Sequence, residues 1–310
     1  MRNICVLILA HKNIEQLKRL CRRINNTYIH IIIHLDKKMS VSKDDVNDLM
    51  AVSSQLHVCS ERYSCTLDDW SLVEATLTMI RDAQKQIQNI RYYALLSGQD
   101  YPIKPISEFV KFLHENYPQP YIDCTPYNIS NWIYPKFNHT ILMKYAKRIK
   151  HTKHIKGIVY ITSLIERILP HCLFTDYKFQ KYGIPIYGGS AWWVLPDIII
   201  NEIMKIVDED KEIIDCYKRS ITPEETFFQT LAMNSSLSAM ISLNEMNQIE
   251  QNCLTFSSFF IGKNEFMGHP HIIKAENFDI IIRKNLFFAR KFDMNIDSSV
   301  LELIDKHIGH

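Results

Sequence analysis

Residues 4–35 read ICVLILAHKNIEQLKRLCRRINNTYIHIIIHL, and this stretch decides the fold. It opens with a continuous apolar run over Ile4–Ala10 and closes with a second one over Ile29–Leu35. Runs of this kind indicate strands that are buried on both faces. Between them, apolar residues recur at helical spacing over Ile14–Ile24, and Asn13 can cap that helix. The stretch therefore predicts a β-α-β unit, which joins two parallel strands.

The alternation of strand and helix patterns continues along the chain. Ser71-Leu72-Val73-Glu74 has the form of a capping box and opens a helix that runs to about Ile87. Further strands are predicted at Gln55–Cys59, Tyr92–Leu96, Pro120–Asp123 and Ala191–Leu195, and further helices at Pro196–Val207, Pro223–Met233, Ala275–Arg283 and Ser298–His307. Together these segments predict an α/β fold, with a Rossmann-like, mostly parallel sheet that helices flank on both faces.

Composition sets further bounds. The 310 residues are 46% hydrophobic, which is enough to bury a large core. The formal net charge of +2 excludes binding of nucleic acid through overall charge, and we expect no nucleic-acid partner. The 8 cysteines are scattered through apolar segments without a C-x-x-C pair, as expected of reduced core residues rather than of a zinc site. No apolar stretch is long enough to cross a bilayer, so we expect a soluble, cytoplasmic chain.

Several cofactor and metal motifs are absent from the sequence. The 8 glycines form neither G-x-G-x-x-G nor a P-loop, so the glycine-rich phosphate cradles are missing. His269-Pro270-His271 has no carboxylate or cysteine nearby in sequence. The only D-x-D match, Asp208-Glu209-Asp210, follows a helical run and is interpreted as a helix end. We therefore predict no metal site and no cofactor, and expect Lys, Arg and His to neutralise any bound diphosphate.

Polar clusters follow three of the predicted strands. They are His11-Lys12-Asn13, His34-Leu35-Asp36-Lys37 and Ser97-Gly98-Gln99-Asp100. Since the ligands of doubly wound sheets bind beyond the carboxyl ends of the strands, we expect these clusters to form a nucleotide site on one rim. The alternative is that each cluster is an ordinary polar loop.

The segment Thr222-Pro223-Glu224-Glu225-Thr226 allows two interpretations. In the first it is a helix start, with Thr222 as the N-cap, Pro223 at the first helical position and Glu225 as the capping-box partner. In the second, a carboxylate at a helix start faces a cleft and serves as a general base. The residue pattern alone leaves both open.

Five segments, taken together, resemble the core 2/I branching β-1,6-N-acetylglucosaminyltransferase and peptide O-xylosyltransferase family. They are Trp70–Ala75 (W-S-L-V-E-A), Tyr92–Lys104 with its S-G-Q-D-Y-P-I-K, Gly189–Trp193 (G-S-A-W-W), Pro223–Thr230 (P-E-E-T-F-F-Q-T) and Leu286–Asp293 (L-F-F-A-R-K-F-D). They occur in the family's order and cover nearly the whole chain. The resemblance implies a soluble member of bacterial type with one GT-A-like glycosyltransferase domain, whose nucleotide-binding half spans about 1–125 and whose acceptor and catalytic half spans about 126–310. It also implies a UDP-sugar donor and no D-x-D metal site.

The resemblance implies roles for individual residues as well. Glu225 maps onto the base that deprotonates the acceptor hydroxyl, and Glu224 stands beside it where the family usually has Asp. Lys291 maps onto the lysine that faces the donor diphosphate, and Arg290 adds charge next to it. Further donor or nucleotide contacts are expected from His11, Asp36, Ser97, Asp100 and His271, and sugar or acceptor contacts from Ser190, Trp192, Trp193 and Glu224.

The reaction expected from these roles is an inverting transfer of GlcNAc or xylose from a UDP-sugar to a glycan hydroxyl, in cell-surface polysaccharide synthesis. Fixed cationic side chains would replace a metal ion in stabilising the leaving diphosphate. The alternative is a non-catalytic nucleotide-sugar-binding partner in a glycan assembly complex. A sulfotransferase-like enzyme would need a phosphate-binding loop that the sequence lacks.

One basic stretch is left unexplained by these roles. Lys144–Lys156 carries six cations, namely Lys144, Lys147, Arg148, Lys150, Lys153 and Lys156. It is either a solvated basic helix or a patch that docks the enzyme on an anionic membrane surface, where a lipid-linked acceptor would sit. In the second case the chain would be peripheral at the inner face of the membrane. Trp132 either stacks on a sugar or belongs to the core.

Overall fold

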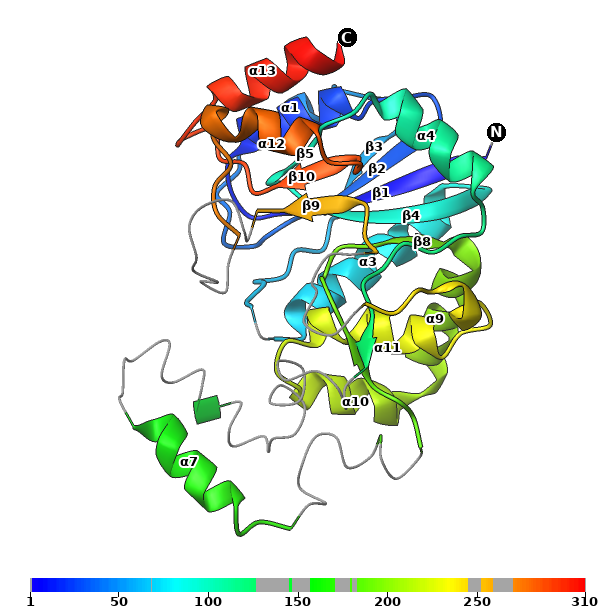
Figure 1. The fold of residues 1–310 in the computed structure, drawn as a ribbon, viewed down its shortest axis with the longest axis vertical. Helices are drawn as coiled ribbons and strands as arrows, with labels where there is room; N and C mark the ends of the chain where they lie inside the picture. Colours follow the sequence, from blue (N-terminus) through cyan, green and yellow to red (C-terminus); the bar gives the residue numbers. More distant parts are fainter. Residues whose placement is uncertain are drawn as a thin grey trace.

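The structure is a computed structural model that describes residues 2–67, 69–126, 145–146, 157–170, 179, 183–244, 252–258 and 270–309. Figure 1 shows a central sheet with helices on both of its faces. Trp132, His269 and nearly all of Lys144–Lys156 lie outside the described residues. None of the helices in the described ranges has both the length and the apolar character that crossing a membrane requires.

The central sheet has five strands in the order β3-β2-β1-β4-β8. They are β1 (Asn3–Ala10), β2 (Ile29–Leu35), β3 (Leu56–Val58), β4 (Ile90–Ser97) and β8 (Val194–Pro196). The first four run parallel, and β8 pairs antiparallel with β4. The predicted α/β fold with a mostly parallel sheet is confirmed. Ala10 pairs with Leu35 and Leu9 with Ser97, so β1, β2 and β4 end at the same rim.

The central strand β1 shows why helices cover both faces of the sheet. Ile4, Val6 and Ile8 belong to one buried cluster, whereas Cys5 and Leu7 belong to another. All five side chains are completely buried. Because successive side chains of a strand point to opposite faces, a continuous apolar run needs a helix layer on each side.

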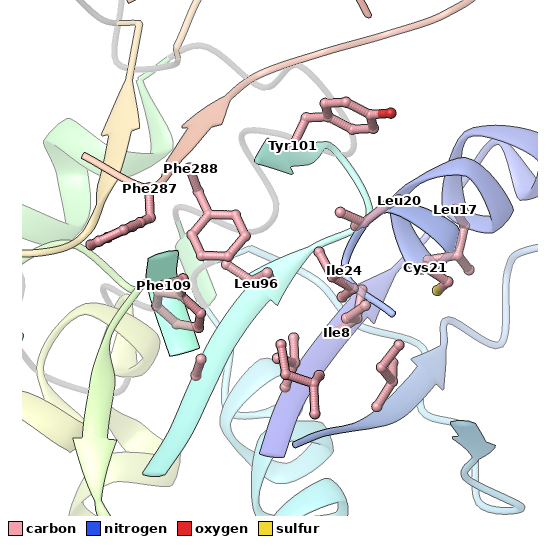
Figure 2. Close-up of a cluster of buried hydrophobic side chains, with 14 of the residues drawn as sticks. Ile8, Leu17, Leu20, Cys21, Ile24, Leu96, Tyr101, Phe109, Phe287 and Phe288 are labelled. Atoms are coloured by element: carbon pink, nitrogen blue, oxygen red, sulfur yellow. The ribbon is translucent and has the colours of Figure 1, made fainter. Parts of the chain in front are cut away.

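The two helix layers are built from separate parts of the chain. Helices α1 (Ile14–Arg23), α4 (Ile106–Glu115) and α13 (Ser299–Ile308) cover one face, and α3 (Ser71–Gln86), α9 (Asp197–Glu209), α10 (Lys211–Arg219) and α11 (Phe227–Met233) cover the other. Figure 2 shows the first layer, where Leu17, Leu20 and Cys21 of α1 lie over the sheet beside Ile8, and where Phe109, Phe287 and Phe288 continue the cluster. Further helices are α2 (Lys43–Met50), α7 (Ile158–Glu166) and α12 (Phe278–Ile282).

Two smaller sheets join segments that are far apart in the sequence. β5 (Asp100–Pro102), β10 (Phe288–Arg290) and β9 (Thr255–Ser257) form a sheet in the order β5-β10-β9. Its register pairs Arg290 with Asp100, so the C-terminal part of the chain is held against the turn that follows β4. A two-stranded ribbon joins β6 (Thr125–Pro126) to β7 (Tyr187–Gly188).

The helix caps follow the sequence signals in part. The Asn13 side chain accepts a hydrogen bond from the Gln16 N–H at 3.1 Å, so the predicted cap of α1 is confirmed. The predicted capping box at Ser71 is wrong, since α3 has Trp70 at its N-cap position without a side-chain cap. The Ser71 hydroxyl instead accepts from the Thr66 N–H at 3.0 Å. This hydrogen bond therefore holds the loop that precedes α3.

Several predicted elements differ from the structure. The predicted helix Ala275–Arg283 divides into a 3-10 turn, Ala275–Asn277, and α12, and the predicted strand Ala191–Leu195 is shortened because β8 begins at Val194. Pro120–Asp123 forms an isolated bridge at Tyr121 rather than a strand, since Pro120 has no N–H to donate to a ladder. The predicted helix Pro223–Met233 divides into a 3-10 turn, Pro223–Glu225, and α11, because the backbone of Thr226 (φ −135°) leaves the helical region.

Candidate active site

Cationic side chains gather on the rim where β1, β2 and β4 end. His11 and Lys12 follow β1, and Arg290 and Lys291 come from the end of β10 and the residue after it. Burial, followed by the charges of Arg290 and Lys12, lowers the pKa of Lys291. Burial, followed by the charges of Lys12 and Lys291, also lowers the pKa of His11. These mutual effects place the four side chains in one electropositive group, called here the basic cluster.

Two members of the basic cluster are ion-paired and one is not. Lys12 Nζ lies 2.6 Å from Asp293 Oδ2, and Arg290 Nε lies 2.9 Å from Asp100 Oδ1. Within the described part of the chain, the half-buried ammonium of Lys291 forms no ion pair and no side-chain hydrogen bond. Partial removal of a cation from water raises its free energy when no ion pair compensates for the lost hydration. An anion bound next to Lys291 would remove that cost.

Asp100 and Trp192 hold the guanidinium of Arg290 from two sides. Asp100 is completely buried and accepts from Ser97 N–H at 2.6 Å and from Ser97 Oγ at 3.0 Å, besides its bond to Arg290. Burial raises the pKa of Asp100, while Arg290 and Ser97 oppose the rise. The Arg290 guanidinium carbon lies 4.2 Å from the centroid of the Trp192 ring. The structure thus brings Ser97, Asp100 and Trp192 together around Arg290, which they orient.

A buried glutamine fastens the chain that carries Lys291. Gln16 Nε2 donates to the carbonyls of Gly98 and Phe292, both at 3.1 Å. The Met294 N–H donates to Gln16 Oε1 at 2.8 Å. Because Gln16 lies in α1 and Gly98 in the turn after β4, these bonds tie the C-terminal segment to two fixed elements. The position of Lys291 is therefore determined by rigid neighbours.

Asp36 lies on the rim at the carboxyl end of β2. Its carboxylate accepts from the N–H groups of Lys38 (2.8 Å) and Cys65 (3.1 Å). Next to it, His34 Nε2 accepts from the Tyr63 N–H at 2.9 Å, and burial lowers the pKa of His34 to about 4. Both side chains therefore organise the loop that borders the rim, and His34 is neutral at pH 7.

Glu225 lies in a 3-10 turn, and its side chain is half-buried. The predicted positions of Thr222 before a helical turn and of Pro223 at its start are confirmed, but the predicted capping box is wrong. Thr222 has a left-handed backbone (φ 52°) without a side-chain cap, and its hydroxyl donates to the Ile221 carbonyl at 2.7 Å. Left-handed geometry at a β-branched residue is unfavourable and gathers at functional sites. Helix capping therefore does not explain why a glutamate stands at position 225.

The G-S-A-W-W segment is fastened directly to the turn of Glu225. The Gly189 N–H donates to the Glu225 carbonyl at 2.8 Å, and Gln229 Nε2 donates to the Ser190 carbonyl at 2.6 Å. Since Trp192 stacks on Arg290 a few residues later, a continuous series of contacts runs from Glu225 to the basic cluster. The turn of Glu225 is thus linked to Arg290 through the segment that carries Ser190 and Trp192.

The two neighbouring tryptophans have different surroundings. Trp193 is 1% exposed and packs on Phe228, with ring centroids 4.7 Å apart. This corrects the expectation that Trp193 contacts a sugar, because strand alternation turns it into the core while Trp192 stays half-buried under Arg290. Phe227 and Phe228 pack in the same core, and Phe227 meets Trp70 at a centroid distance of 5.3 Å.

His271 is exposed, and backbone pairing holds it near the end of β10. The His271 N–H donates to the Ser258 carbonyl at 3.3 Å, and the Ser258 N–H donates to the Arg290 carbonyl at 2.9 Å. His271, which the resemblance predicted as a donor contact, is therefore close in space to Arg290. His269 lies outside the described residues, and no group of metal-ligating side chains occurs within those that are described.

The D-x-D match lies at the junction of α9 and α10. Asp208 accepts from Arg81 at 3.0 Å, and the Asp210 side chain caps α10 by accepting from the Ile213 N–H at 3.0 Å. The interpretation of this segment as a helix end is confirmed.

The sequence did not identify Gln16 as a residue that positions the site. It gave no signal for this role, because Gln16 acts through Phe292, which is distant in sequence.

Gly189 is required by close packing against Asp123. A Cβ at position 189 would lie 1.9 Å from the Asp123 carbonyl oxygen and 2.6 Å from its carbonyl carbon. Gly189→Ala is therefore expected to lower the free energy of unfolding by about 3 kcal/mol or more, as measured by urea unfolding. At Gly98 the added Cβ would lie 3.3 Å from a side-chain atom of Ala10. Gly98→Ala is the matched control, and equal losses in the two variants would contradict this account.

Comparison with known proteins shows the family to which the chain belongs. The family described as Core-2/I-Branching enzyme matches residues 4–282. Xylosyltransferase sqv-6 of Caenorhabditis elegans is 23% identical over 96% of this chain and 35% of its own length. A human β-1,3-galactosyl-O-glycosyl-glycoprotein β-1,6-N-acetylglucosaminyltransferase is 22% identical over 99% of this chain and 70% of its own length. Mouse xylosyltransferase 2 is 23% identical over 98% of this chain and 33% of its own length. The chain thus spans about a third of the xylosyltransferases that it matches.

Proposed function

Because this chain belongs to the Core-2/I-Branching enzyme family, we propose that it is an inverting glycosyltransferase that moves a sugar from a UDP-sugar to a glycan hydroxyl. The relatives named above support GlcNAc or xylose as the donor sugar. The product would carry a β-linkage, and synthesis of cell-surface polysaccharide is the proposed role. The observation that carries the proposal is the half-buried Lys291, which forms no ion pair with any of the described residues.

Lys291 and Arg290 are the proposed binding groups for the donor diphosphate. Arg290 is fixed in place by Asp100 and Trp192, and the chain of Lys291 is fixed by Gln16. Positive groups that are already oriented stabilise a leaving diphosphate without having to reorganise during the reaction. His11 and His271 border the same group, and Asp36 and Ser97 shape the rim around it. In this proposal the fixed cations supply the charge that a divalent metal ion supplies in other glycosyltransferases.

Glu225 is the proposed general base. As the acceptor oxygen attacks C1 of the donor sugar, the C1–O bond to the diphosphate breaks, and the hydroxyl proton passes to the Glu225 carboxylate. The leaving UDP carries away the bonding electrons and stays paired with Lys291 and Arg290. Attack from the side opposite the leaving group converts an α-linked donor into a β-linked product. Ser190, Trp192 and Glu224 adjoin this position and are the proposed sugar and acceptor contacts.

The second candidate function is a binding partner without catalysis in a glycan assembly complex. It would share the basic cluster but would not need a half-buried carboxylate at position 225. The family, whose relatives named above are transferases, supports the enzyme.

The proposed function is tested by a thermal-shift panel in EDTA with UDP-GlcNAc, UDP-xylose, UDP and a GDP-sugar control. A ligand present at a hundredfold excess over its Kd stabilises the folded state by about 2.7 kcal/mol. We expect stabilisation of this order from UDP and from at least one UDP-sugar, and none from the GDP-sugar. A panel in which no uridine nucleotide shifts the melting temperature would rule out the proposed donor class.

A further inference from the structure

Helix α7 presents an apolar stripe to solvent. Tyr160, Ile161, Leu164, Ile165 and Ile168 are 68%, 58%, 41%, 42% and 82% exposed. Figure 1 shows α7 apart from the sheet and its helix layers. At about 100° per residue, the four stripe residues within the helix lie on one face about 140° wide. Exposed apolar patches of this kind mark interaction surfaces.

Two hydroxyls of α7 are hydrogen-bonded within the helix. The Thr162 hydroxyl donates to the Ile158 carbonyl at 2.8 Å, and the Ser163 hydroxyl donates to the Tyr160 carbonyl at 2.8 Å. A hydroxyl that is bonded to its own helix can enter an apolar medium at less cost than an unbonded one. These two hydroxyls therefore add little to the cost of bringing the apolar stripe into a water-poor environment.

The sequence around α7 concentrates positive charge. Residues 144–167 include seven Lys or Arg residues and one acidic residue, Glu166, which is a surplus of six positive charges. Since the whole chain has a surplus of two, the remainder carries four net negative charges. In a second copy of this chain the same stretch of sequence carries the same positive charge, which opposes self-association. An anionic lipid surface instead attracts the flank and accepts the apolar stripe.

We propose that the α7 stripe docks on an anionic membrane surface, lying in the plane of the interface with its apolar residues among the acyl chains. The helix has nine residues, so it lies on the bilayer rather than spanning it. The negative charge of the rest of the molecule would keep the catalytic body off the lipid. This inference does not rest on the proposed function, because it concerns binding without a donor or an acceptor.

The test is flotation of the full chain with vesicles of phosphatidylcholine, alone or with about 30% phosphatidylglycerol. The bound fraction is expected to rise with phosphatidylglycerol and to fall with salt. The double variant Ile161→Ser/Ile165→Ser should lose about tenfold in vesicle affinity, and Ile168→Ser, which lies beyond the helix, should lose part of it. Ile280→Ser, which changes a 46% exposed isoleucine of α12, is the matched control and should bind as the unmodified chain does.

Three results would overturn the proposal. The first is equal binding to vesicles with and without phosphatidylglycerol at low salt. The second is unchanged vesicle binding in both stripe variants. The third is a dimer in sedimentation experiments without lipid that the double variant converts to a monomer, since a second copy would then cover the stripe. Circular dichroism of each variant verifies that the fold is retained.

Discussion

Replacing Glu225 by glutamine is expected to lower the rate of sugar transfer by about 10²–10⁴-fold while leaving UDP-sugar affinity nearly unchanged. Glutamine keeps the size and hydrogen-bonding capacity of the side chain but cannot accept the acceptor proton. The turn that carries residue 225 is held through its backbone, by the Gly189 N–H, so the substitution does not remove this contact. The loss should therefore appear in kcat rather than in donor binding.

The matched control for this variant is Glu224→Gln, which makes the same chemical change at the adjacent position. We expect it to lose much less activity, because its proposed role is to support the acceptor. Turnover is followed as UDP release, and donor binding by calorimetry. Unchanged turnover in Glu225→Gln, or a larger loss in Glu224→Gln, would show that the base has been assigned to the wrong residue.

Replacing Lys291 by methionine is expected to lower kcat by about 10²–10³-fold and to weaken UDP-sugar binding as well. Methionine retains the apolar stem, so packing is kept while the charge next to the proposed diphosphate is lost. Lys291→Arg keeps the charge and should retain part of the activity. If Lys291→Met bound UDP-sugar and turned over like the unmodified chain, the proposed charge neutralisation would be wrong.

The pH dependence of donor binding tests the role of the Lys291 ammonium independently. Burial and neighbouring cations lower the pKa of Lys291 in the free protein, so it loses its proton at a lower pH than an ordinary lysine, whose pKa is about 10.4. UDP-sugar affinity should therefore fall as the pH rises toward that value. In Lys291→Arg, which stays protonated throughout, the fall should disappear. A decline that persists unchanged in the arginine variant would have to come from another group.

The parts of the fold that the sequence predicted are those with strong local periodicity. β1, β2 and β4 are continuous apolar runs, and α1 has both a periodic face and an Asn13 cap. The three-residue strands β5, β9 and β10 were not predicted, because their pairing joins residues that are distant in sequence. At Thr222 the sequence predicted a helix with a capping box. The structure instead has a left-handed backbone at Thr222, and the turn that follows is held by the hydrogen bond from Gly189 N–H to the Glu225 carbonyl.

The sequence predicted the parts of the candidate site in which polar or charged residues directly follow a predicted strand. The ends of β1 and β4 meet on one rim, as the strand order requires, and hydrogen bonds of Gln16 hold the segment around Lys291 beside them. The direction of each side chain was less predictable. Trp192 and Trp193 are identical residue types, and only the structure shows that one stacks on Arg290 while the other lies in the core.

The central claim is that Glu225 and the basic cluster carry out an inverting, metal-independent transfer from a UDP-sugar. The most direct test uses water as the acceptor, which removes the need to know the natural one. Concentrated protein is incubated with UDP-GlcNAc or UDP-xylose in EDTA, and the first sugar released is followed by proton NMR before it mutarotates. We predict that the β anomer appears first and that Glu225→Gln releases none. Initial release of the α anomer, or release that requires a divalent metal ion, would contradict the account.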